Sequence, residues 1–152
     1  MTWYGVLKVV HVLSVVIWIG AGAAFAMITA RLVRARDRAT LASFLPLIQK
    51  YMQSAAGPAS LLVLLTGIAM VVVARIGFQP LWVSWGFAGI VVHFLFGALV
   101  MRKRMMALGQ AVAVSPADEN GIALAGARLR LANLIYLLVM TSVIVVMVLK
   151  PV

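Results

Sequence analysis

Two histidines, His11 and His93, each lie inside a long apolar stretch of the sequence and are its residues best suited to chemistry. Ionisable side chains inside a membrane are costly, so they mark functional sites or pair with a polar partner. Neutral imidazole is also the commonest metal ligand among side chains. The sequence therefore predicts one buried site in which His11 and His93 are the two metal ligands of a shared cofactor.

Around the first histidine, three further side chains share its helical face. Lys8 and Ser14 lie three residues from His11, and Trp18 lies seven residues after it. If the cofactor is a haem, Lys8 and Arg75 are the basic residues expected to bind its carboxylates. Packing and interhelical hydrogen bonding would also account for Ser14 and Trp18.

Around the second histidine, Gly89 and Gly97 lie four residues before and after His93. Small residues above and below an imidazole would leave a groove for a flat macrocycle. They equally permit close helix packing, which is their commoner use in membranes.

Tryptophans suggest that the two rings lie at similar depth. Trp3 precedes His11 by eight residues, and Trp85 precedes His93 by eight. If both tryptophans mark one membrane interface, each ring lies about 12 Å from it. The first and third helices of an up-and-down bundle face each other across a diagonal of roughly 13 Å. That gap suits two imidazoles with a haem iron between them.

The elements that must position this site are membrane-spanning helices. The chain has 152 residues, of which 65% are hydrophobic and 11% charged, with a mean hydropathy of +1.14. Surface-to-volume scaling excludes a soluble domain of this composition. We expect one domain, residues 1–152, folded as an all-α, up-and-down bundle of four transmembrane helices. Their expected ranges are about 3–30, 40–74, 81–101 and 116–149.

Basic residues indicate the topology. Ten of the thirteen lie in or beside the first and third connections, and the others are Lys8, Arg75 and Lys150. The positive-inside rule therefore predicts both termini outside and both long loops in the cytoplasm. The loops are expected to contact anionic lipid. Nucleic acid binding is not expected, because no aromatic residues are interleaved with the basic ones.

Local signals refine two of the helices. Ser115 and Pro116, followed by two acidic residues, predict that the last helix begins near residue 116. Pro46 and Pro58 are expected to bend the second helix, because proline removes a backbone donor. Small-residue pairs in the first helix would serve either a homo-oligomer or the bundle itself.

Copper is an alternative cofactor. Thioethers bind Cu(I), and methionines occur in the apolar spans at positions 27, 70, 140 and 147. They are dispersed, however, and methionine commonly serves as a flexible filler. The absence of cysteine from the sequence excludes thiolate metal sites and cysteine nucleophiles.

Three stretches resemble a group of small bacterial membrane proteins. They are Leu7-Lys8-x-x-His11 with Trp18 and Gly20, residues 56–67, and His93 followed by basic residues at 102–104. The group includes the small four-helix, haem-containing protoporphyrinogen oxidases and the membrane domain of copper-resistance protein D. The chain looks closest to the group's uncharacterised integral membrane family.

This resemblance implies a four-helix bundle in the bacterial inner membrane, with b-type haem in some members and an essential histidine at the position of His11. The oxidases carry an intramembrane lysine early in the third helix, and residues 81–90 contain none. That difference speaks against porphyrinogen oxidation while leaving haem binding open.

The leading hypothesis is a b-type haem protein that transfers electrons between a membrane quinone or partner protein and an acceptor outside. A porphyrinogen oxidase-like enzyme, a copper permease and a non-catalytic membrane module remain the alternatives.

Overall fold

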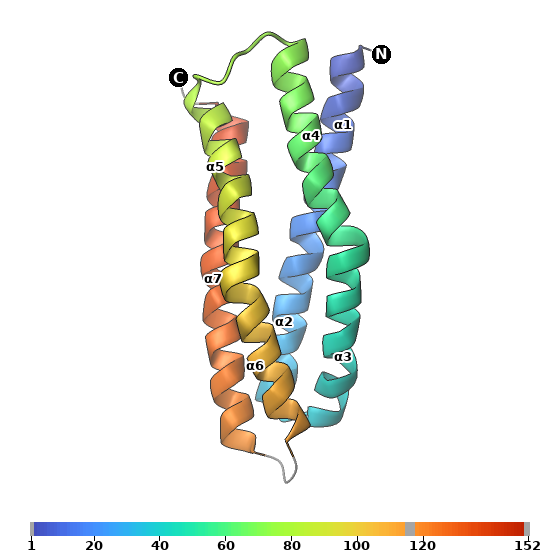
Figure 1. Ribbon diagram of the computed structural model, residues 1–152, viewed down its shortest axis with the longest axis vertical. Helices are drawn as coiled ribbons and strands as arrows, with labels where there is room; N and C mark the ends of the chain where they lie inside the picture. The colour runs from blue at the N-terminus through green and yellow to red at the C-terminus, as the bar shows by residue number, and fades with distance from the viewer. Residues whose placement is uncertain (1, 115–117, 151–152) are drawn as a thin grey trace.

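The structure, a computed structural model, describes residues 2–114 and 118–150, and these residues form helices and connections without a strand. Four long apolar helices cover Trp3–Arg34, Arg38–Val73, Leu81–Ala113 and Glu119–Leu149. The predicted all-α fold of four membrane-spanning helices is confirmed (Figure 1).

Each of the first three long helices is divided by one π-helical turn. The elements in chain order are α1 Trp3–Val15, η1 Val16–Gly20, α2 Ala21–Arg34, α3 Arg38–Tyr51, η2 Met52–Ala56, α4 Gly57–Val73, α5 Leu81–Phe96, η3 Gly97–Met101, α6 Arg102–Ala113 and α7 Glu119–Leu149. A π-turn leaves a main-chain carbonyl without its usual helical partner and often marks a functional region. In η1 the carbonyl of Ile17 accepts a 2.7 Å hydrogen bond from the Tyr51 hydroxyl.

Neighbouring helices alternate in direction, so the bundle has the expected up-and-down topology. In one half, which carries both chain termini, α1 packs along α4 and α5 packs along α7 (Figure 1). In the other half, α2 packs against α3 and α7, and α6 packs against α3 and α7. We call these the terminal half and the loop half. The first and third long helices thus lie on a diagonal.

The helices are longer than a bilayer requires. Lengths of 31–36 residues correspond to about 46–54 Å at 1.5 Å per residue, against a hydrocarbon layer of about 30 Å. The loop half has its own buried cluster, which consists of Leu41, Leu108, Val112, Ile122 and Leu129. Arg38 links α3 to the end of α6 beside this cluster, because its guanidinium donates hydrogen bonds to the carbonyls of Val112 (2.8 Å) and Val114 (2.6 Å).

Two aspartates begin helices in the loop half. Asp37 caps α3, and hydrogen bonds from the side chain and backbone N–H of Thr40 hold the pKa of its carboxyl below the usual value. Asp118 caps α7 by accepting a hydrogen bond from the backbone N–H of Gly121. The predicted start at residues 115–116 lies outside the described residues. Which membrane face the loop half adjoins stays a prediction from its basic residues.

A contrast between two glycines tests the packing of the loop half. A Cβ at Gly126 of α7 would lie 2.6 Å from Val33 Cγ1, whereas a Cβ at Gly109 of α6 would have nothing within 4 Å. Because Val33 is β-branched and rotamerically stiff, Gly126→Ala should destabilise the protein by about 1–3 kcal/mol. Gly109→Ala should stabilise it by about 0.5–1 kcal/mol through helix propensity.

Unfolding of both variants in one detergent, followed by circular dichroism, measures this difference. Equal stability of the two variants would contradict the close α2–α7 packing at Gly126.

Candidate cofactor site

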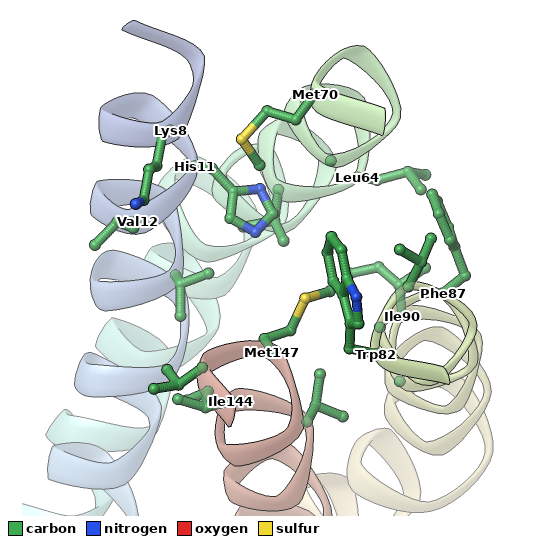
Figure 2. A pocket seen from close by; sticks show the side chains of 18 of the residues that line it. Lys8, His11, Val12, Leu64, Met70, Trp82, Phe87, Ile90, Ile144 and Met147 are labelled. Atoms are coloured by element: carbon green, nitrogen blue, oxygen red, sulfur yellow. The ribbon is translucent and has the colours of Figure 1, made fainter. Parts of the chain in front are cut away.

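A cavity of about 650 Å³ lies in the terminal half, between the α1–α4 pair and the α5–α7 pair (Figure 2). This volume is within the range of about 300–1,000 Å³ that is typical of ligand pockets. Trp18 and Met140, both buried in the central apolar cluster, line its inner end. The remaining walls are mostly aliphatic and aromatic side chains.

His11 lines this cavity, and one hydrogen bond fixes how its ring is presented. Its Nδ1 lies 2.9 Å from the Thr66 hydroxyl oxygen on α4. That hydroxyl donates its own proton to the carbonyl of Leu62, a common arrangement for threonine within a helix. The Thr66 oxygen must therefore accept from His11 Nδ1–H, which leaves Nε2 with a lone pair and without a proton.

Two methionines bring thioethers to the same space from different helices. Met70 of α4 lies beside His11, and the sulfur of Met147 of α7 lies across the cavity near Trp82 (Figure 2). Gly86 of α5 makes room for Met147, because a Cβ at this position would overlap the Met147 methyl group. Nothing in the sequence pattern separates these two from methionines that only fill the core.

The cations among the described lining residues are Lys8 and Lys150. The Lys150 ammonium lies 5.2 Å from the centre of the Trp82 ring, within the range of a cation–π interaction. Arg75, expected in this role, is not among the described lining residues. It follows the end of α4 with a left-handed backbone, φ 52°. Lys150, and not Arg75, is thus the second basic residue of the described cavity lining.

His93 belongs to a different environment. Its Nδ1 is 2.8 Å from the Tyr136 hydroxyl of α7, and its ring packs edge-on against Trp18 with centroids 4.3 Å apart. Trp18 follows His11 by seven residues, which corresponds to about 10 Å along a helix. The expectation of two facing rings at equal depth is therefore wrong.

Trp3 and Trp85 do not mark a common depth in this bundle, although the equal spacing from each to its histidine suggested that they would. Trp3 and Trp85 both favour an interfacial zone, but the packing brings Trp18 level with His93. By the same count, His11 lies level with Gly86, and Trp3 lies level with residue 78. The first helix thus extends beyond the start of α5, and tryptophans do not report such an offset between helices.

The other expected site residues divide between the cavity and the packing. Trp18 and Gly89 line the cavity, whereas Ser14 is buried and is not among the described lining residues. A Cβ at Gly89 would lie 2.6 Å from Val143 Cγ2, so this glycine serves close α5–α7 packing. A Cβ at Gly97 would have nothing within 4 Å, and Gly97 lies outside the cavity lining. The two glycines do not form one groove.

The cavity lining offers one imidazole and three thioethers, those of Met70, Met140 and Met147, among mostly apolar side chains. Within residues 2–114 and 118–150, no three histidine, cysteine, aspartate or glutamate side chains gather as a metal site. A metal held here would therefore need ligands beyond such side chains, which a macrocycle or the thioethers would provide.

Comparison with known proteins identifies the family. Residues 5–151 match the family described as predicted integral membrane protein (DUF2269). The chain belongs to this family. No curated protein and no solved structure matches it. The match supports the expected uncharacterised integral membrane family and the multi-pass membrane location.

The chain's two histidines allow a direct test of their separate environments. Thr66→Val removes the acceptor of His11 Nδ1–H, and Tyr136→Phe removes the hydroxyl bonded to His93. Because the two pairs lie on different helices at different depths, each substitution should change the imidazole nitrogen chemical shifts of its own histidine alone. Solid-state or detergent NMR of the labelled protein measures this. A variant that shifts both rings equally would indicate one shared site.

Proposed function

We propose that this membrane protein binds a haem b, or a closely related metalloporphyrin, in the terminal-half cavity, with His11 as its protein nitrogen ligand. The supporting observations are the His11–Thr66 hydrogen bond, which leaves Nε2 as the unprotonated ring nitrogen, and the place of His11 in the lining of a cavity of about 650 Å³. A ligating histidine characteristically donates its other ring N–H to an acceptor, which fixes its tautomer and raises its basicity.

The residues present fit such a group. Aliphatic and aromatic walls would cover the macrocycle and exclude water, and Lys8 and Lys150 would bind its carboxylates. Met147 or Met70 would offer a second, thioether ligand, as in His/Met cytochromes. The group, when bound, supplies one-electron chemistry. The chain would hold it in a medium of low dielectric constant and tune its potential through Thr66 and the apolar shell.

Electron transfer between a membrane quinone or partner protein and an acceptor beyond the membrane is the role that this arrangement favours. A second candidate, a porphyrinogen oxidase-like enzyme, is favoured by the place of His93 outside the cavity lining. With a single histidine, the metal would keep an open position unless a methionine fills it.

A copper permease is favoured by one observation, the presence of Met70 and Met147 in the cavity of His11. The cavity volume of about 650 Å³ is much larger than a bare ion requires, which argues against copper alone as the main ligand. A small ligand such as a water molecule occupies about 30 Å³, a small part of this space. If the protein is a non-catalytic membrane module, the cavity would bind no metal.

Substitution of the two histidines tests the proposal. His11→Ala should abolish the sharpening and shift of the Soret band that distinguish bound from free haem, because it removes the nitrogen ligand. His93→Gln should leave the spectrum unchanged, because His93 lies outside the cavity. Thr66→Val should weaken haem affinity about 10–100-fold, the usual effect of losing such a supporting partner. Titration of the purified protein with haem, read by absorbance, measures all three. Wild-type protein that retains no haem after free haem is removed, and that binds Cu(I), would favour the permease.

The carboxylate contacts provide a separate prediction. Lys8→Gln and Lys150→Gln should each lower haem affinity, because each removes a cation from the cavity lining. Arg75→Gln is the matched control, since Arg75 has the same charge and lies in the terminal half but not in the cavity lining. Competition of each variant with apomyoglobin for haem measures the difference. An equal loss in all three variants would indicate a general effect of surface charge.

A further inference from the structure

The two sides of the cavity differ in exposure. Where α4 faces α5, the lining residues Val71, Val83 and Ile90 are only 6%, 1% and 8% exposed. Leu64 and Phe87, which also line the cavity there, are partly exposed. This side therefore offers a large ligand less accessible surface than the side between α1 and α7.

On the side where α1 faces α7, the lining side chains are exposed. Val12 and Val16 of the first long helix are 51% and 61% exposed, and Ile144 and Val148 of α7 are 38% and 74% exposed. We call these four residues the slot. Figure 2 labels Val12 and Ile144 on their two helices. All four are aliphatic, and the slot therefore opens to the surroundings without a polar side chain of its own.

In a membrane-spanning bundle, the surroundings of the slot are hydrocarbon. Val12 and Val16 lie about 14 and 20 Å along the helix from Trp3, which is deep enough to reach the apolar layer. An empty apolar cavity deprives its lining of contact partners, and apolar cavities do not hold water well. Acyl chains of the bilayer are the adjacent material that would fill it.

The basic side chains of the terminal half favour a lipid with an anionic head group. Lys8 and Lys150 line the cavity, and Lys8 lies one turn before Val12 on α1. All three acidic residues of the sequence, Asp37, Asp118 and Glu119, lie at the loop end. An anionic group at the mouth of the cavity would therefore meet two ammonium groups and no carboxylate side chain.

We propose that the cavity is a lipid-binding site that opens to the bilayer through the slot. When the cavity holds no haem, its ligand is an anionic phospholipid, with an acyl chain inside the cavity and the phosphate held by Lys8 and Lys150. This inference rests on the cavity, the slot and the two lysines, and it does not require the metal. A haem would occupy the same space and would displace the acyl chain.

Tryptophan quenching by brominated lipid tests the site. A variant with Trp82 as its sole tryptophan (Trp3, Trp18 and Trp85 each changed to Phe) reports on the cavity, which Trp82 lines. In nanodiscs of phosphatidylglycerol brominated near the glycerol end of the acyl chain, Trp82 should be strongly quenched, because the Lys150 ammonium that would hold the phosphate lies 5.2 Å from the centre of its ring. Adding Val16→Phe and Ile144→Phe, which obstruct the slot, should remove most of this quenching.

A matched control uses Trp85 as the sole tryptophan. Trp85 is 43% exposed and is not among the described cavity lining, so its quenching by surrounding lipid should not respond to the slot substitutions. Quenching of Trp82 that is absent, or unchanged when the slot is obstructed, would overturn the proposal.

Native mass spectrometry of the unsubstituted chain gives a second measurement that does not depend on replacing Trp18. The protein should retain one phosphatidylglycerol in preference to phosphatidylcholine, and the slot variant or the Lys8→Gln/Lys150→Gln variant should lose it. Equal retention of both lipids would overturn the assignment of an anionic head. Neither measurement uses haem. The lipid proposal can therefore be tested even if the absorbance titration shows no haem binding.

Discussion

Each partly buried imidazole in this bundle needs a hydrogen-bond partner, and that need organises the terminal half. Thr66 supplies it for His11, and Tyr136 supplies it for His93. The first pair joins α1 to α4, and the second joins α5 to α7. Unpaired polar groups in hydrocarbon cost several kcal/mol each, so these bonds help to determine which helices pair. The cavity lies between the two pairs, and its position follows from that pairing.

The two hydrogen bonds differ in what they leave available. The Thr66 hydroxyl is already a donor to Leu62, so His11 must donate and keeps an accepting nitrogen. Tyr136 can donate to or accept from His93, and the His93 ring packs against Trp18. His11 thus has the features of a ligand facing a cavity, whereas His93 has those of a packed polar residue. The same residue type serves two purposes, and its partner distinguishes them.

Sequence patterns predicted the four helices, and several of the residues that they singled out line the cavity. Four apolar runs and two basic connections were sufficient for the bundle, because membrane helices must satisfy their backbone internally. The patterns also identified His11, Lys8, Trp18 and Gly89, which line the cavity. They failed on the relative height of α1 and α5, since that offset depends on packing between residues distant in sequence. For the same reason they missed Thr66 as the partner of His11 and the place of Lys150 in the cavity lining, both of which depend on contacts between helices.

One cavity, two kinds of ligand and one route of entry form a consistent physical picture. A haem is an amphiphile with an apolar ring and two carboxylates, and an anionic phospholipid has two apolar chains and one phosphate. Both match aliphatic walls bordered by Lys8 and Lys150. What separates them is Nε2 of His11, which a metal would bind and an acyl chain would leave without a partner. The imidazole would therefore distinguish a bound metalloporphyrin from a lipid, and a ligand of either kind would reach the cavity from the bilayer through the slot between α1 and α7.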